Sequence, residues 1–198
     1  MANDLKQETR RPGLIRRAWT WLSTPSAKWS VLALLVGGVV IGGGSVIATQ
    51  VMVAQTGTNE FCGGACHSMQ WVSQEYKKSI HFANSKGIQA TCHDCHIPRA
   101  YPQLLWYKAK VGIRDVIQET RGVISTEEKF NKERPRLAKA VWAEYKETNS
   151  ANCRQCHAFT PEIIAKQKEF VQPMHKMALT GESTCIDCHK GVAHTAPE

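Results

Sequence analysis

Residues 90–98 read ATCHDCHIP and residues 184–191 read TCIDCHKG, so one chain carries the same TC-x-DCH wording twice. A third stretch, residues 153–157, reads CRQCH. In all three, two residues separate the cysteines and a histidine directly follows the second one. C-x-x-C-H is the attachment signature of c-type haem, in which both thiols form thioethers and the adjacent imidazole ligates the iron. Zinc sites and redox dithiols also use C-x-x-C, but neither explains a histidine in this register three times.

The eight cysteines of the 198-residue chain form four close pairs, and none is left over. The pairs are Cys62/Cys66, Cys92/Cys95, Cys153/Cys156 and Cys185/Cys188, followed in turn by His67, His96, His157 and His189. The first pair has three intervening residues, so a disulfide or a metal site is its alternative. Because two glycines there can absorb one extra residue of backbone, and His67 keeps its place, we expect a haem at this pair too. The sequence therefore predicts four covalently bound haem c groups.

Second axial ligands are sought among the four histidines that lie outside these positions. His93 lies between Cys92 and Cys95 and cannot reach the far face of its own haem. The remaining candidates are His81, His175 and His194. Two imidazoles on one iron favour electron transfer over small-molecule binding, because both faces are filled. Three histidines cannot serve four irons, so Met69, two residues after His67, is either a thioether ligand or a packing residue.

The run at residues 31–53 (VLALLVGGVVIGGGSVIATQVMV) carries no charge, and about 20 apolar residues suffice to cross a bilayer. A cleaved signal peptide is the alternative, but its apolar core is shorter, at about 7–15 residues. Residues 1–30 hold six basic and two acidic side chains, whereas residues 54–76 hold no Lys or Arg. The positive-inside rule therefore predicts a cytoplasmic N-terminus at 1–30, a span at 31–53 and residues 54–198 in the bacterial periplasm.

The chain also has a two-half layout, since motif, spacer histidine and motif follow one another twice. We expect a di-haem module at about residues 60–100 and another at about 150–195. Residues 101–148 between them are typical of helix, and Pro135 and Pro161 are each expected to begin one. The predicted fold is mainly α: a single N-terminal transmembrane helix plus an α-helical multihaem cytochrome c domain whose core is mostly haem. The net charge of +8 includes no dense basic stripe with interleaved aromatics, so nucleic-acid binding is not expected.

In wording, the chain resembles the NapC/NirT/NrfH family of membrane-anchored tetrahaem quinol dehydrogenases over nearly its whole length. The resemblance rests on Phe61-Cys62 after the span, the CHSM run at 66–69, Ser79-Ile80-His81, and the stretches 90–98 and 184–191. It implies residence in the inner membrane and oxidation of a membrane quinol, menaquinol or ubiquinol, at the first haem. It also implies electron delivery to a periplasmic redox enzyme of the nitrate or nitrite reductase type.

Two departures from the family pattern concern the ligands. Arg99 stands where some members have a histidine, which agrees with only three distal histidines here, and the C-x-x-x-C spacing of the first motif is atypical. In the NrfH branch, the methionine that matches Met69 ligates the first haem, and an acidic residue occupies the other side of that haem. The resemblance therefore leaves His67 and Met69 as alternative ligands of the first iron.

The resemblance also points to a quinol site, because Lys108 and Asp115 match the lysine and the acidic residue implicated in the family's quinone pockets. The two are seven residues apart, and hence on one face of a helix. Quinol oxidation releases two protons, so a carboxylate and a cation near the haem are chemically sensible. A solvated helical face is the alternative, since Lys110 and Arg114 lie nearby.

The leading hypothesis is a relay from quinol through four haems to a periplasmic redox enzyme or cytochrome. The same relay run in reverse, from a periplasmic oxidase such as hydroxylamine oxidoreductase to quinone, stays open because haem potentials depend on burial and surrounding contacts. A small-molecule reductase at an open haem is a second alternative, and a passive scaffold or haem carrier is a third. A homo-oligomer and a hetero-complex both remain open.

Overall fold

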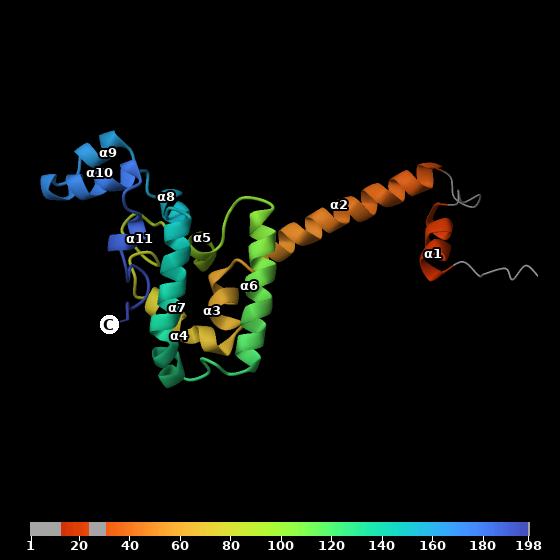
Figure 1. The fold of residues 1–198 in the computed structure, drawn as a ribbon, viewed down its shortest axis with the longest axis horizontal. Coiled ribbons are helices and arrows are strands. Elements are labelled where there is room, and N and C mark those ends of the chain that lie inside the picture. Colours follow the sequence, from red (N-terminus) through yellow and green to blue (C-terminus); the bar gives the residue numbers. More distant parts are fainter. Residues whose placement is uncertain (1–12, 24–30, 198) are drawn as a thin grey trace, which may run out of the picture. The chain divides into compact units, whose positions relative to one another are not determined.

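The computed structural model describes residues 13–23 and 31–197, and the regular elements in these ranges are all helical (Figure 1). The predicted mainly-α class is confirmed. The chain divides into two compact units, residues 1–49 and residues 50–198.

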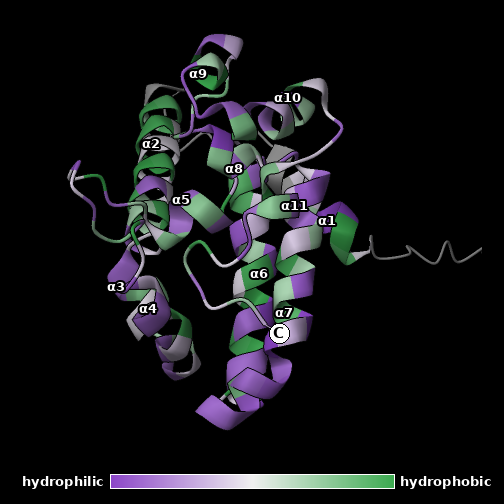
Figure 2. Ribbon diagram, turned by 90° about the vertical axis from the view of Figure 1, so that its left-hand side faces the viewer, coloured by the Kyte–Doolittle hydropathy of each residue, from purple (hydrophilic) through white to green (hydrophobic). Residues whose placement is uncertain are grey.

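The first unit contains α1 (Leu14–Ser23) and most of α2 (Val31–Gln55). Figure 2 shows α2 hydrophobic along its length, and its residues Ala33–Gln55 are long and apolar enough, by length and composition, to cross a membrane. Its hydroxyls are satisfied within the helix, since Ser45 Oγ and Thr49 Oγ1 each donate to the carbonyl oxygen four residues back, at 2.8 Å. Such internal pairing is what a lipid environment requires of a polar group. The span expected at 31–53 lies within this helix.

The second unit consists of short helices and two long ones, and Figure 1 labels them in chain order. They are α3 (Asn59–Gly64), α4 (Gln70–Tyr76), α5 (Cys92–His96), α6 (Gln103–Thr120), α7 (Glu127–Glu147), α8 (Ala151–Arg154), α9 (Pro161–Ala165), α10 (Gln172–Thr180) and α11 (Cys185–Cys188), with 3-10 turns at His67–Met69 and Glu169–Val171. The long helices α6 and α7 are joined by a hydrogen bond of 3.0 Å from Tyr107 Oη to Glu144 Oε2.

Helix α7 begins earlier than the sequence suggested. The Thr126 hydroxyl accepts a hydrogen bond from the backbone N–H of Lys129, and two glutamates occupy the first turn, where they complement the helix dipole. Pro135 therefore lies inside α7, and the expectation that it begins a helix is wrong. Pro161 does begin α9, behind a Thr160 cap, as expected.

Apolar side chains supply little of the interior. The buried hydrophobic residues in the described part of the chain are Val53, Tyr76, Leu104, Phe130, Ile164, Ala178 and Ile186. They are scattered along the chain rather than gathered into one run. A unit of about 150 residues ordinarily buries about two thirds of the surface of its unfolded chain. So sparse an apolar core agrees with the expectation that large prosthetic groups fill this domain.

Candidate functional site

Each C-x-x-C-H motif is folded around about one turn of helix. The second motif is α5 itself, and the fourth begins at the first residue of α11. Both helices start with a capping box, in which a threonine and the aspartate three residues later bond each other's backbone: Thr91 with Asp94 and Thr184 with Asp187. The threonine and aspartate of the shared TC-x-DCH sequence therefore cap a helix that begins at the first cysteine.

The first motif is built differently, because Cys62 lies within α3 whereas Cys66 precedes the 3-10 turn His67–Met69. Cys66 itself has an extended backbone, with φ −107° and ψ 124°, so helical spacing does not set the relation of these two thiols. Of its two glycines, Gly63 has a specific steric role: a Cβ there would come within 2.5 Å of Ser73 Oγ on α4. All eight cysteines of the chain are free of disulfides, including Cys62 and Cys66.

The described structure brings six of the predicted ligand histidines together in three pairs. The ring centres are 6.2 Å apart for His81 and His157, 6.2 Å for His96 and His194, and 6.1 Å for His175 and His189. An imidazole nitrogen binds a metal at about 2 Å and the ring centre lies about 1 Å behind it, so two imidazoles on one ion have centres about 6 Å apart. Every pair joins one motif histidine to one candidate distal histidine. The residues present therefore fit an iron held between two imidazoles at the second, third and fourth motifs.

The orientation of two distal rings supports the same arrangement. His81 Nδ1 lies 3.2 Å from the carbonyl oxygen of Val192, and His175 Nδ1 lies 2.5 Å from Gln167 Oε1. When Nδ1 donates to an oxygen, Nε2 is left free as the metal-binding atom. Burial, together with the charge of His194, lowers the pKa of His96 to about 4, which keeps that ring neutral as a ligand must be.

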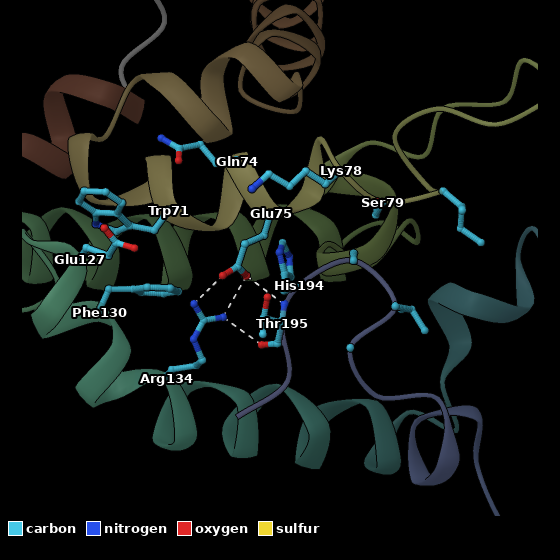
Figure 3. A pocket seen from close by; sticks show the side chains of 14 residues that line it. Trp71, Gln74, Glu75, Lys78, Ser79, Glu127, Phe130, Arg134, His194 and Thr195 are labelled. Atoms are coloured by element: carbon cyan, nitrogen blue, oxygen red, sulfur yellow. Dashed lines mark hydrogen bonds and ion pairs between the residues drawn. The ribbon is translucent and has the colours of Figure 1, made fainter. Parts of the chain in front are cut away.

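The segment that carries His194 is tied down beside a pocket of about 540 Å³ (Figure 3). Arg134 of α7 donates to both carboxylate oxygens of Glu75 on α4, at 2.9 and 2.5 Å, and to the carbonyl oxygen of Thr195 at 2.9 Å. The backbone N–H of Thr195 also donates a hydrogen bond to Glu75 Oε2, with 3.0 Å between the nitrogen and the oxygen. Two helices are thereby connected to the residue next to His194. This network gave no signal in the sequence, because its members are far apart along the chain.

One face of α6 lies beside the first motif. Lys108 Nζ donates to the carbonyl oxygen and to Oγ1 of Thr56, both at 2.9 Å, and burial lowers the pKa of Lys108. The thiol of Cys62 has its pKa lowered to about 7, first by a hydrogen bond with Cys92 and further by the charge of Lys108. Asp115 pairs with Arg114 at 3.1 Å rather than with Lys108.

Glu119 joins this face and was missed at the sequence level. Burial first, and then the negative charges of Glu119 and Asp115, raise the pKa of the Cys66 thiol, so both carboxylates lie near the first motif. Glu119 also accepts hydrogen bonds from the backbone N–H and the hydroxyl of buried Ser68, in the turn between the two candidate ligands. Its position four residues after Asp115 was the available signal, because residues i and i+4 share a helical face.

The other candidates differ in their surroundings. His67 is exposed, and its Nε2 lies 3.3 Å from the amide nitrogen of Gln70, whereas Met69 is half-buried. His93 is half-buried near Lys108, and burial followed by that positive charge lowers its pKa.

Comparison with known proteins decides the family. A model of the NapC/NirT cytochrome c family, N-terminal region, matches residues 24–198. The chain belongs to the NapC/NirT cytochrome c family. Because cytochromes c carry their haem covalently, membership implies covalently bound haem c on this chain.

Individual relatives agree with the family match. The chain is 45% identical over 186 residues to the cytochrome c-type protein TorC of Escherichia coli K12, covering 93% of this chain but 47% of TorC. It is 39% identical over 193 residues to the cytochrome c-type protein NapC of the same strain, covering 96% of this chain and 94% of NapC. The chain thus spans about half the length of TorC and nearly all of NapC.

Among solved structures, a chain of the cytochrome c nitrite reductase NrfHA complex bound to the inhibitor HQNO is 26% identical, with a TM-score of 0.49. The match covers 82% of this chain and 90% of that one.

Proposed function

We propose that this chain is a membrane-anchored tetrahaem cytochrome c that passes electrons from membrane quinol to a periplasmic redox enzyme. The observation that carries the proposal is the set of three imidazole pairs beside C-x-x-C-H turns. In the proposed topology, residues 1–30 are cytoplasmic, α2 crosses the inner membrane and residues 54–198 are periplasmic, in accord with the charge asymmetry about the apolar run.

The proposed axial sets follow the pairs: His157 with His81, His96 with His194, and His189 with His175. Filled axial positions leave no site for a substrate on those irons, which suits electron transfer. Bound haem supplies reversible one-electron chemistry, so the residues of the chain have only to hold, insulate and orient it. The first haem remains the exception, with His67 or Met69 as its protein ligand.

Quinol oxidation is placed at the first motif, on the face of α6 that carries Lys108 and Asp115. One quinol yields one quinone, two electrons and two protons, so the site needs a hydrogen-bond donor to hold the ring oxygen and a base to take a proton. Lys108, fixed on Thr56 at the end of α2, is placed to donate. Asp115, half-exposed and held by Arg114, is placed to accept a proton and pass it to water.

Electrons would leave toward the partner near the third and fourth motifs. Cys156 and Cys188 are exposed, whereas the cysteines of the first two motifs are all partly buried. A thioether bond holds the porphyrin edge at its cysteine, so an exposed cysteine brings that edge to the surface. One cysteine of each of the last two motifs is exposed, although Cys153 and Cys185 are partly buried, and this supports a soluble redox partner at these motifs.

The proposal is tested by comparing two routes of reduction in purified protein. We expect Asp115→Asn to slow menaquinol-driven haem reduction by about 100-fold or more, the usual scale for losing a proton-transfer group. Lys108→Met should slow it by about tenfold through loss of a charged hydrogen-bond donor, while dithionite reduces all haems normally in both variants. Lys139→Met, at an exposed position of α7, is the control and should behave as the wild type. Equal menaquinol rates in all four proteins would remove this face from the reaction, and an intact mass with three haems would refute the tetrahaem assignment.

A further inference from the structure

Helix α6 has a third face, which neither the interior nor the proposed quinol site uses. Trp106, Ile113, Val116 and Ile117 are exposed, by 73%, 64%, 59% and 42%. At about 100° per residue, these four positions fall within a sector of about 100° on the helix, and we call them the α6 stripe. The sector that contains Lys108, Asp115 and Glu119 borders it on one side. Exposed apolar side chains scattered singly are ordinary, whereas a continuous row along one helix indicates a binding surface.

Two contacts place α6 at the end of the apolar part of α2. Tyr101, two residues before α6, donates from its hydroxyl to Gln50 Oε1 at 3.0 Å, and Gln50 belongs to the candidate span. Lys108, in the second turn of α6, holds Thr56, the residue that follows α2. At 1.5 Å per residue, Gln50 lies about 8 Å inside the end of α2. The start of α6 is therefore at the level where a bilayer around α2 would end.

Cations flank the stripe on the side away from the quinol face. Lys110 and Arg114 are both exposed there, although Arg114 also pairs with Asp115. An apolar row bordered by Lys and Arg, with Tyr and Trp at its beginning, is the composition of helices that lie in a membrane interface. Acidic headgroups would complement this edge in a way that uncharged lipid would not.

We propose that the α6 stripe is a lipid-docking surface, which seats α6 in the outer interface of the same bilayer that α2 crosses. The occupant is phospholipid, because the stripe begins at the end of the span, where lipid is already present and a soluble protein would have to displace it. The proposal of this surface depends on the two contacts with the end of α2 and on the exposed side chains of the stripe, and it does not depend on the haems.

The next step rests on the proposed function. The placement of α6 in the interface would give quinol a route from the bilayer to the Lys108–Asp115 face. The Lys108–Asp115 face adjoins the stripe on α6, so a quinol diffusing within the leaflet would reach that face without crossing water. The isoprenoid tail would stay in lipid beside the stripe while the ring turns toward Lys108.

The test uses the full haem-loaded protein in phospholipid nanodiscs, with the photoreactive residue p-benzoylphenylalanine at one position at a time. Trp106 probes the stripe, and Phe170 is the matched control, since it is 71% exposed and lies between α9 and α10. Both are exposed aromatic positions, so neither substitution disturbs a buried contact. After illumination, mass spectrometry of the tryptic peptides should show phospholipid adducts at position 106 several-fold above those at position 170, and more with phosphatidylglycerol than with phosphatidylcholine alone.

Other outcomes overturn the proposal: no lipid adduct at position 106, equal yields at both positions, or crosslinks from position 106 to a reductase added to the nanodiscs. The functional part is separated by Ile113→Asn/Val116→Asn. This variant should lose most menaquinol-driven reduction in nanodiscs yet keep the wild-type rate with a water-soluble short-chain quinol. If lipid adducts form at position 106 but the protein oxidises neither quinol, the lipid-docking surface is supported and the proposed function is refuted. If menaquinol is oxidised at the normal rate but no adducts form, the proposed function is supported and the lipid-docking surface is refuted.

Discussion

Replacing Arg134 by methionine should release the C-terminal segment that carries His194. The guanidinium makes two hydrogen bonds to Glu75 and one to the Thr195 carbonyl, at 2.5–2.9 Å. The Arg134 and Glu75 side chains are 15% and 21% exposed, so solvent screens them only partly. Charge-assisted hydrogen bonds contribute about 1.5–3 kcal/mol each when well buried, and exposed ion pairs less than about 1. For this partly buried set we expect a net loss of about 2 kcal/mol, or about 30-fold in the equilibrium between docked and released segment.

The assay is hydrogen exchange of the amides of residues 192–196, read together with the low-spin haem spectrum by electron paramagnetic resonance. Exchange should accelerate by about 30-fold, and part of the low-spin signal from the His96 haem should convert to high spin. Arg136→Met is the matched control: Arg136 is on the same helix, is 65% exposed and, among the residues that the structure describes, has its ion pair with neighbouring Glu133, so both readouts should stay unchanged. Unchanged exchange at Thr195 in the Arg134 variant would refute the role of Arg134 in holding this segment, as would an equal change in the control.

Three further predictions follow from the same site. Acid should loosen the segment that carries His194. Burial opposes ionisation of Glu75, but hydrogen bonds from Arg134 and Thr195 outweigh burial and lower the pKa of Glu75 in the folded protein. The stabilisation is therefore complete above the ordinary glutamate pKa near 4.3 and is lost as the pH falls through the lowered pKa of the folded state. Hydrogen exchange of residues 192–196, measured from pH 6 to 3, checks this prediction, and an equally steep pH dependence in Arg134→Met would contradict it. Glu119→Ala should free the 67–69 turn through loss of both Ser68 contacts, shifting the potential and spectrum of the first haem alone, whereas exposed Glu128→Ala should do neither. His175→Gln should remove about a third of the bis-imidazole low-spin signal, since it breaks one of three pairs, and an undiminished signal would reject the pairing with His189.

The sequence predicted those features that depend on neighbouring residues. C-x-x-C-H places thiols and imidazole within one helical turn, and the uncharged run of α2 has the length of a span, so both could be predicted from residues close together. The Pro135 expectation failed for the same local reason: proline suits a first turn, but the Thr126 cap and the glutamates that follow it begin α7 further upstream.

What the sequence could not supply was the pairing of distant residues. His96 faces His194 and His81 faces His157, and no periodicity connects positions so far apart. The distal set could be counted from the composition, but its assignment required the fold. Lys108 and Asp115 share a helical face as expected, yet their neighbours Thr56 and Arg114 emerge only in three dimensions. Glu119 was overlooked because nothing local shows that its partner is Ser68.

Two of the three imidazole pairs join the first half of the chain to the second, which bears on the order in which the protein can mature. If residues 54–198 enter the periplasm in chain order, as the proposed topology requires, the second motif emerges about a hundred residues before His194. If the pairs are the axial sets proposed here, the haem on Cys92 and Cys95 waits with one face open until His194 has been translocated. A chain that stalls or is clipped shortly before His194 would then expose an incompletely ligated iron to oxygen. The arrival of His194 would thus complete the ligation of a cofactor attached about a hundred residues earlier in the chain.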